Sequence, residues 1–241
     1  MPPARPAGAN RLSAAREPVL LAWSGGKDAA WALHQLRQRG DVEVVGLLCT
    51  VRGDDGRATM QEVAREVLHA QARAAGLPLL EVALPDPCPN HGYERAMAAA
   101  LAGAAARWPG LHTIAYGDLL LGDLRDWRAA QLARLGWRLE TPLFGSDTAA
   151  LAQSMLRGGL QARLCCVDTQ QLDARFAGRA FDAALLAALP PAVDPCGERG
   201  EFHTCVHAGP MFDAPLSLAP VASRRRDGRF AVVDFALGAP A

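Results

Sequence analysis

Short apolar runs alternate with longer amphipathic stretches along the first half of the chain. An uninterrupted apolar run is typical of a strand buried on both faces, and apolar residues at helical spacing predict a helix that packs on a sheet. The predicted strands are 19–23, 42–51, 79–84 and 112–116. The predicted helices run from the turn after residue 23 to about residue 40, and over 60–75, 93–108 and 124–135. This repeated strand–helix order predicts an α/β fold with a doubly wound, mainly parallel sheet.

The repeated order ends at 141–145, where the sequence reads Thr-Pro-Leu-Phe-Gly. Beyond it we expect a helix that Ser146 or Asp147 caps, then an apolar strand, a short helix and two strand-like pieces. Their ranges are 147–157, 160–167, 181–189, 202–207 and 229–236. This mixture predicts a smaller α+β C-terminal domain.

The chain therefore divides into three parts. Residues 1–17 are rich in Pro, Ala and Arg and lack the apolar core of a secretion signal, so we expect a disordered leader. Residues 18–145 would form the α/β domain and residues 146–237 the smaller one. Since no apolar run reaches the roughly 18 residues that cross a bilayer, we expect no membrane partner and a cytoplasmic protein.

The charge balance argues against a nucleic-acid partner. The chain has 25 Lys and Arg against 25 Asp and Glu, so its formal net charge is zero and no strong field would steer it to an anionic polymer. The one dense basic run is Arg224–Arg226. We expect it to be a solvated turn before the last strand.

The cysteines show neither a zinc-type spacing nor a Cys-x-x-Cys pair. Cys49, Cys165 and Cys166 lie in apolar runs and are predicted to be small core residues. Cys88 and Cys196 lie in proline-rich loops without an activating base beside them, so a catalytic thiol is the weaker interpretation there.

The turn Ser24-Gly25-Gly26-Lys27-Asp28 follows the first predicted strand and precedes the first predicted helix. The two glycines would let the backbone approach a ligand closely, and the helix would point free N–H groups and the positive end of its dipole at a phosphate. The plainer interpretation is an ordinary connecting loop with an exposed Lys27–Asp28 pair. The spacing excludes a Walker A loop and the common Gly-x-Gly-x-x-Gly dinucleotide motif.

This turn resembles the pyrophosphate-binding loop of the PP-loop ATP pyrophosphatases, which cleave ATP between the α and β phosphates. The family loop usually ends with Ser or Thr. Here Ala29 takes that place, which removes one hydroxyl contact and puts full catalytic activity in question.

Two further polar clusters follow along the chain. The first is Gly117–Arg128, and the second is Cys196–Thr204, which reads Cys-Gly-Glu-Arg-Gly-Glu-Phe-His-Thr. Each has a plainer interpretation: Asp123 caps the next helix, and Glu198 and Glu201 are exposed loop carboxylates.

Taken in order, Ser24–Asp28, Gly117–Arg128 and Cys196–Thr204 resemble the motifs of the diphthine–ammonia ligase family, over residues 19 to about 235. The resemblance implies an N-type ATP pyrophosphatase of the adenine nucleotide alpha hydrolase-like class, with a HUP-like PP-loop domain and a smaller C-terminal domain. The motif ends with Phe202-His203-Thr204, which looks like the bacterial branch of the family. The resemblance therefore does not imply that this chain acts on the substrate for which the family is named.

The resemblance implies ATP-dependent adenylation of a small-molecule or protein carboxylate, with release of pyrophosphate, and amidation by ammonia or an amine. ATP and Mg²⁺ are the implied cofactors. The residues expected to bind the nucleotide are Trp23, Ser24, Gly25, Gly26, Lys27, Asp28, Cys49, Thr50 and Gly117. The expected catalytic residues are Lys27, Asp118, Arg125, Arg128, Glu198 and Glu201, and the expected Mg²⁺ ligands are Asp28 and Asp118.

Within this scheme Arg125 and Arg128 would hold the α-phosphate or the substrate carboxylate. Glu198 and Glu201 would orient the amine or take its proton. His203 is a weaker acid–base candidate, and on a strand it more often has a structural role.

Two alternatives stay open. A PP-loop tRNA-modifying enzyme would need a basic surface and often catalytic cysteines, which the composition disfavours. A non-catalytic ATP or AMP sensor is favoured by Ala29 and disfavoured by the glutamates of the last motif. The sequence also leaves a homodimer open.

Overall fold

The computed structural model describes residues 16–59, 61–85, 87–120 and 122–238. The predicted leader therefore lies almost entirely outside the described residues. Glu17, its last residue, is instead the first residue of a strand. No helix of these residues is long and apolar enough to cross a membrane.

A parallel five-stranded sheet forms the first layer of the fold. Its strands lie in the order β3-β2-β1-β4-β5. The elements are β1 (Glu17–Ala22), α1 (Lys27–Gln38), β2 (Val42–Arg52), α2 (Arg65–Ala74), β3 (Leu79–Leu84), α3 (Asn90–Arg107), β4 (Thr113–Ala115), α4 (Gly122–Arg134) and β5 (Arg138–Glu140). The direction of winding reverses between β1 and β4, and ligands of such sheets bind at this point. The predicted α/β fold is confirmed.

The remaining chain builds a separate antiparallel sheet in the order β7-β6-β9-β8. Its elements are α5 (Thr148–Arg157), β6 (Gln161–Asp168), the 3₁₀ turn η1 (Ala174–Phe176), α6 (Ala183–Ala188), β7 (Phe202–Ala208), β8 (Leu218–Arg226) and β9 (Phe230–Leu237). Asp147 caps α5, as predicted, because its carboxylate accepts the amide of Ala150 at 2.8 Å. The mixed α+β character of this smaller part is confirmed.

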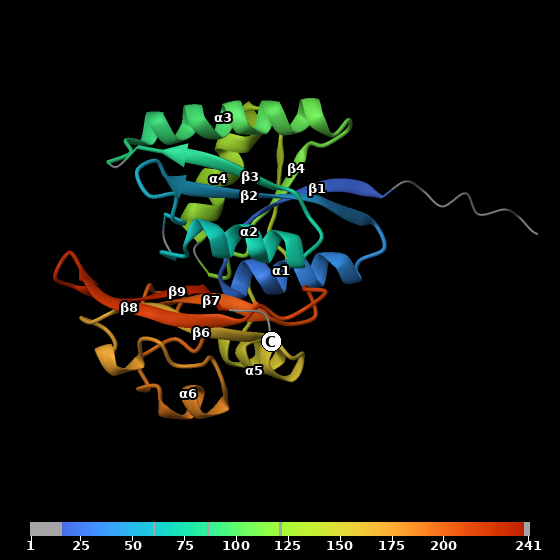
Figure 1. Ribbon diagram of the computed structural model, residues 1–241. Coiled ribbons are helices and arrows are strands. Elements are labelled where there is room, and N and C mark those ends of the chain that lie inside the picture. Colours follow the sequence, from blue (N-terminus) through green and yellow to red (C-terminus); the bar gives the residue numbers. More distant parts are fainter. Residues whose placement is uncertain (1–15, 60, 86, 121, 239–241) are drawn as a thin grey trace, which may run out of the picture.

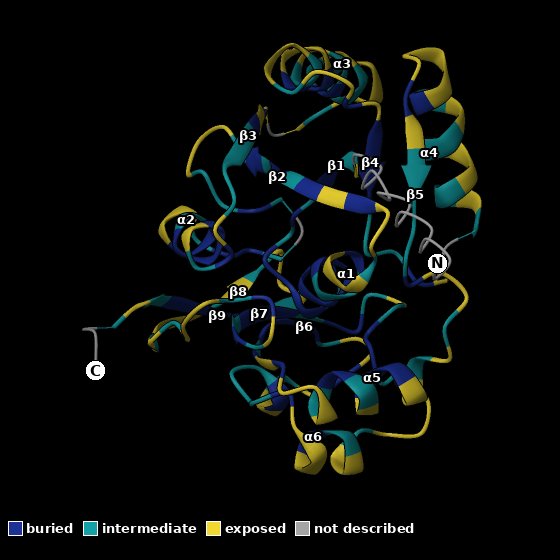
Figure 2. Cartoon of the chain, turned by 90° about the vertical axis from the view of Figure 1, so that its right-hand side faces the viewer, coloured by how far each residue is buried: buried dark blue, intermediate teal, exposed yellow. Residues whose placement is uncertain are grey.

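The layers stack so that α1 and α2 lie between the two sheets (Figure 1). Helices α3 and α4 cover the far face of the parallel sheet, and α5 and α6 cover the far face of the antiparallel one (Figure 2). Leu33 of α1, Leu164 of β6 and Val206 of β7 are fully buried in one hydrophobic cluster. Because α1 packs on both sheets, its N-terminus is held from two sides.

Several elements differ from the prediction. The short strand β5 and the strand β8 were not predicted. Arg224–Arg226 belong to β8, so the prediction of a turn is wrong there. Helix α2 begins at Arg65, later than predicted, because Glu62 adopts a left-handed backbone with φ of 61° and so cannot continue a helix.

Candidate functional site

The Ser24–Asp28 turn lies at the carboxyl end of β1, directly before α1. Gly25 has φ of +79°, and a Cβ there would lie 3.0 Å from both Oε1 of Gln71 and Cδ2 of Leu68. The turn therefore requires glycine for both its conformation and its close packing. Gly26 precedes the first residue of α1, and no side chain of its own caps the helix.

Two side chains that had no predicted role hold this turn in place. Gln71 of α2 is fully buried; its amide nitrogen donates to the carbonyls of Gly25 (3.0 Å) and Val206 (2.7 Å), and its oxygen accepts Nε1 of Trp23 (3.0 Å). Thr204 of β7 accepts the amide of Lys27 at 3.0 Å. The only visible signal for Gln71 was a polar residue on the apolar stripe of a predicted helix.

Lys27 is the only lysine in the chain, since every other basic residue besides histidine is arginine. Its side chain is 2% exposed, and Nζ lies 2.7 Å from Asp28 Oδ1 and 2.5 Å from the carbonyl oxygen of Cys196. Burial alone would lower the pKa of Lys27, but the carboxylate of Asp28 outweighs it and raises the pKa above the ordinary value. Lys27 therefore carries a fixed positive charge at the helix terminus.

Gly117 brings the end of β4 onto the N-terminus of α1. A Cβ at Gly117 would lie 2.7 Å from the carbonyl carbon of Asp28 and 2.8 Å from the amide nitrogen of Ala29. Asp118 follows it and forms an ion pair with Arg128 of α4. The guanidinium of Arg128 lies 4.3 Å from the centroid of the Tyr116 ring, and its Nε is buried without a hydrogen-bond partner among the described residues.

The two glutamates of the last motif lie in different surroundings. Burial and the nearby Asp28 raise the pKa of Glu198 to about 7. Glu201 is 1% exposed, and its carboxylate accepts the amides of Asp194 (2.8 Å) and Arg199 (2.9 Å). Glu198 is thus poised to exchange a proton near neutral pH, whereas Glu201 braces the loop that carries it.

These groups surround one cavity of about 530 Å³ at the carboxyl edge of the parallel sheet. The predicted site residues that line it are Trp23, Ser24, Gly26, Lys27, Asp28, Cys49, Thr50, Gly117, Asp118, Arg128 and Glu198. Gly25, Arg125 and Glu201 do not line it. Gly25 supports the turn from behind, and Arg125 lies outside, with Nε 3.3 Å from the Thr141 hydroxyl and its guanidinium over the ring of Phe144.

The remaining candidates are neutral groups. His203 of β7 lines the cavity, and burial, aided by Lys27 and Arg226, lowers its pKa to about 4. Burial raises the pKa of Cys196 to about 12, and its thiol donates to the carbonyl of Thr148. Burial likewise raises the pKa of Cys49 to about 12. None of these three is charged at neutral pH, so neither thiol is an activated nucleophile.

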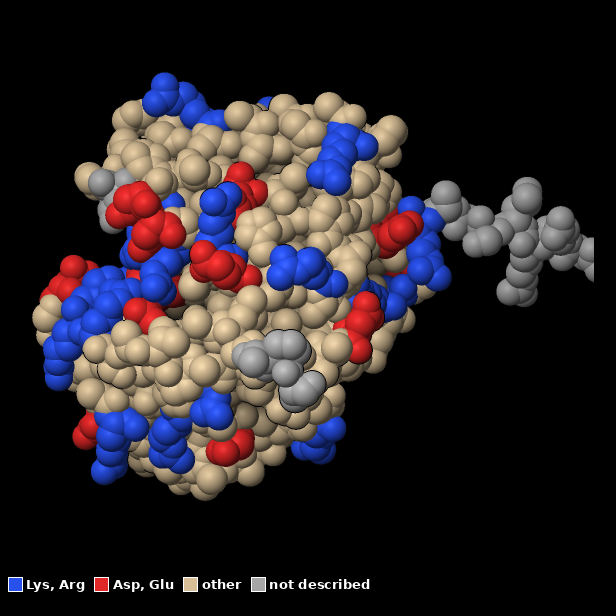
Figure 3. Space-filling model, in the orientation of Figure 1, with Lys and Arg blue, Asp and Glu red and all other residues tan. Residues whose placement is uncertain are grey.

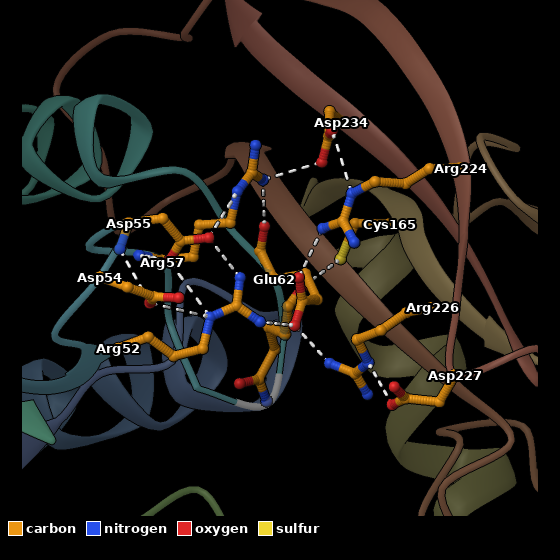
Figure 4. A network of polar contacts seen from close by, with 11 residues as sticks. Arg52, Asp54, Asp55, Arg57, Glu62, Cys165, Arg224, Arg226, Asp227 and Asp234 are labelled. Atoms are coloured by element: carbon orange, nitrogen blue, oxygen red, sulfur yellow. Dashed lines mark hydrogen bonds and ion pairs between the residues drawn. The ribbon is translucent and has the colours of Figure 1, made fainter. Parts of the chain in front are cut away.

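A buried carboxylate outside the predicted set holds the loop after β2. Glu62 has a fully buried side chain that forms ion pairs with Arg52 (2.7 Å), Arg224 (2.6 Å) and Arg226 (Figure 4). Burial alone would raise the pKa of Glu62, but the surrounding arginines hold it below the ordinary value. Arg57, beside it, donates to the Glu62 carbonyl oxygen.

The ion pairs of Glu62 hold a loop that forms part of the cavity wall. Ala58, Thr59 and Gln61 precede Glu62 and line the cavity wall. Arg224 and Arg226 come from β8, so the antiparallel sheet holds a wall of the site in the first sheet. Figure 3 shows basic side chains gathered over the end of the β8–β9 hairpin with acidic ones beside them, which fits paired charges rather than an open basic patch.

The carboxylates in the cavity fit a magnesium ion held together with phosphates. Among the described residues there is no group of three His, Cys, Asp or Glu that could hold a metal alone. Asp28 and Asp118 nevertheless line one cavity, and Mg²⁺ is commonly bound by one or two carboxylates plus substrate phosphates and water.

Comparison with known families identifies both parts of the chain. The family model described as the diphthamide synthase N-terminal domain matches residues 17–127. The model described as the diphthamide synthase C-terminal domain matches residues 147–229. A search of curated proteins gives no match.

Proposed function

The chain belongs to the diphthamide synthase family, whose members have the general character of ATP-pyrophosphatase ligases, and on that premise we propose that it adenylates a carboxylate and converts it into an amide. In the first step a carboxylate oxygen attacks the α-phosphorus of ATP, the bond to the bridging oxygen breaks, and pyrophosphate leaves. In the second, the nitrogen of ammonia or an amine attacks the acyl carbon, loses a proton, and AMP leaves.

One observation carries this proposal: the same cavity is lined by four residues of the turn and by three later residues, namely Ser24, Gly26, Lys27, Asp28, Asp118, Arg128 and Glu198. The turn supplies what a leaving pyrophosphate needs, namely the hydroxyl of Ser24, the positive end of α1 and the buried charge of Lys27. Arg128 and Glu198 supply what the other reactants need, a carboxylate binder and a proton acceptor.

The fit of Asp28 and Asp118 supports a role for Mg²⁺. When bound, the ion would neutralise charge on the phosphate oxygens and orient them. In the described structure Asp28 pairs with Lys27, and Asp118 pairs with Arg128. On binding, Asp28 and Asp118 would turn to the metal. Lys27 and Arg128 would then turn to a phosphate or to the substrate carboxylate, so that none of these four charges would be left unpaired.

Glu198 has the properties of the base for the second step. A proton acceptor works best when its pKa lies near the working pH, and the pKa of Glu198 is about 7. The buried His203 has too low a pKa to hold a proton at this pH, so we assign it a structural role at the cavity wall. Glu201 acts by fixing the loop that carries Glu198.

The test is the identity of the products. The protein is incubated with ATP, Mg²⁺, ammonium and a panel of carboxylic acids, in a buffer that matches the cytoplasm, where we propose it acts. We expect AMP and pyrophosphate. ADP and phosphate would refute cleavage at the α-phosphorus, and nucleotide binding without turnover would favour the sensor alternative.

The single lysine gives a direct test of the binding site. In protein labelled with [¹⁵N]lysine, one backbone amide signal arises, from Lys27. We expect Mg²⁺ and ATP to shift this signal, because Lys27 is the first residue of α1 and lines the cavity. Lys27→Met should abolish AMP formation, while Arg175→Lys, on the 3₁₀ turn η1 outside the cavity lining, should retain it and add a second signal that ATP does not shift.

A further inference from the structure

A second cavity, of about 420 Å³, lies between α3 and α4 on the outer face of the parallel sheet. These two helices lie side by side on that face (Figure 2). The volume is within the range of small-molecule sites. Tyr93, Met97, Tyr116 and Arg128 line both this cavity and the one at the sheet edge. The two cavities therefore share a wall, and Arg128 can be reached from either side.

The lining of the second cavity is largely apolar. It includes Leu101, Leu132 and two large apolar side chains that remain exposed, Trp127 (37%) and Leu135 (45%). Of the residues of α4, Leu132 is the one that is buried. The ring of Trp127 faces α3, where its centroid lies 6.2 Å from that of the Tyr93 ring, and it remains partly exposed. An apolar surface of this kind next to a candidate site is typical of a ligand groove.

Among the residues that line both cavities, Arg128 is the charged one, and it marks the inner end of the groove. The other polar lining residues are His91, Glu94, Arg95, Gln131 and Arg134. The Nε of Arg128 is buried with no partner in the described part of the chain, while its other end pairs with Asp118. A buried guanidinium nitrogen without an acceptor favours an anionic ligand, and a carboxylate is the planar anion that fits it. From Arg128 to Leu135, the residue directly after α4, the groove spans seven residue steps, or about 10 Å at the helical rise.

We propose that this groove binds the tail of the substrate acid, a carboxylic acid with an extended aryl or alkyl chain whose carboxylate reaches Arg128. The inference rests on the proposed ligase function and adds the substrate class to it. Arg128 lies beside Asp118, and Gly117 touches the N-terminus of α1. The carboxylate would thus stand next to the place where the α-phosphate is expected, with its tail directed away from the nucleotide.

The test uses 4-phenylbutyrate as probe acid, with 4-phenyl-1-butanol and acetate for comparison, measured by calorimetry and ligand-observed NMR. We expect the probe acid to bind at least about tenfold more tightly than the alcohol, because the alcohol lacks the charge that Arg128 recognises. Acetate should bind more weakly still, because it has no tail. Equal binding of acid and alcohol, or of probe acid and acetate, would overturn the proposal.

A matched pair of variants on α3 locates the groove. Ala98 lines the cavity, whereas Ala99 is exposed and does not line it. Ala98→Phe should weaken binding of the probe acid at least about tenfold. Ala99→Phe should leave binding of the probe acid unchanged. Both variants should still bind ATP. If Ala98→Phe does not fold, Leu135→Glu, at an exposed position of the groove, should repel the acid.

The outcomes separate this inference from the proposed function. AMP formation with short acids, together with no binding of the probe acid, would leave the ligase proposal standing and overturn the groove. Binding of the probe acid without AMP formation from any acid would leave the groove standing and overturn the ligase proposal. If Ala98→Phe instead converted a dimer into a monomer and the probe acid did not bind, the groove would be an interface between copies and the inference would fail.

Discussion

Replacing Glu62 with glutamine should destabilise the protein and loosen its nucleotide site at the same time. The Glu62 side chain is fully buried, and its partners Arg52, Arg224 and Arg226 are 16%, 34% and 25% exposed. Removing one partner of a buried ion pair costs about 3–5 kcal/mol. Because the three arginines are partly exposed and have other carboxylates nearby, we expect the lower end, about 3 kcal/mol, in the free energy of unfolding.

Asp168→Asn is the matched control for this variant. Asp168 is also a buried carboxylate, but among the described residues its one cationic partner is Arg229, whose side chain is 44% exposed. It also accepts hydrogen bonds from the amide of Gln170 and from Nε2 of Gln171. It lies at the end of β6 and does not line the cavity. We expect a loss of about 1–2 kcal/mol and an unchanged affinity for ATP.

The assay is urea unfolding and thermal melting, followed by calorimetric titration with ATP at a temperature where every variant is folded. About 3 kcal/mol corresponds to a fall in Tm of about 6–12 °C for a chain of this size. Since Glu62 holds the loop that contributes Ala58, Thr59 and Gln61 to the cavity, Glu62→Gln should also weaken ATP binding about tenfold. The reasoning is refuted if Glu62→Gln behaves like Asp168→Asn in both measurements.

The pH dependence gives an independent check. The pKa of Glu62 lies below its ordinary value of 4.5, so its stabilising effect is complete above that pH and is lost as the pH falls through the folded-state pKa. Between about pH 5 and pH 3, wild type should therefore lose more stability than Glu62→Gln. Equal losses would show that the arginines do not stabilise the charged form.

Other substitutions test the remaining parts of the site. Gly117→Ala should abolish ATP binding because its Cβ would strike the backbone of Asp28, whereas Gly103→Ala, with open space around it on α3, should bind ATP normally and gain up to about 1 kcal/mol of stability. Turnover should rise with pH through about 7 as Glu198 ionises, and Glu198→Gln should have a low kcat without this rise. The same variant should be more stable than wild type above pH 7 and equal to it below pH 4.5, because the raised pKa of Glu198 makes its ionisation unfavourable in the folded state. Cys196→Ser should retain activity, because a thiol with a pKa of about 12 is not a nucleophile at neutral pH; complete loss of activity without loss of folding would contradict this.

The parallel sheet and the turn at its edge could be predicted because their signals are local. Strand β3 is apolar apart from Glu81 and is bounded by turn residues, and its predicted ends, 79 and 84, match the structure. The turn after β1 combines glycines with a lysine at the start of a helix, which has a direct physical meaning. The carboxyl ends of parallel strands share one edge, so Gly117 and Asp118 were predicted to lie near this turn, and they line the same cavity.

The parts that escaped prediction depend on contacts between distant segments. Strand β8 is an edge strand, mostly exposed on both faces and containing Pro220, so it shows neither alternation nor an apolar run. Glu62 meets Arg226 across 164 positions of sequence. In the same way, nothing local separates Glu198 from Glu201; only the fold turns one toward the cavity and the other toward two backbone amides.

The paired charges of the site explain how a cavity that contains a buried lysine can bind a highly charged substrate. A lone buried Lys27 would favour the neutral amine, but Asp28 keeps it protonated. Arg128 and Asp118 form a second ion pair in the same cavity. A nucleotide that arrives with Mg²⁺ brings charges of both signs: phosphates for the two cations and a metal for the two carboxylates. Binding then exchanges partners instead of creating unpaired charge. ATP without the metal would leave Asp28 and Asp118 facing phosphate oxygens, so affinity for ATP should fall when Mg²⁺ is removed, and Asp118→Asn should reduce that dependence on the metal. An affinity that is equal with and without Mg²⁺ would contradict this account of the cavity.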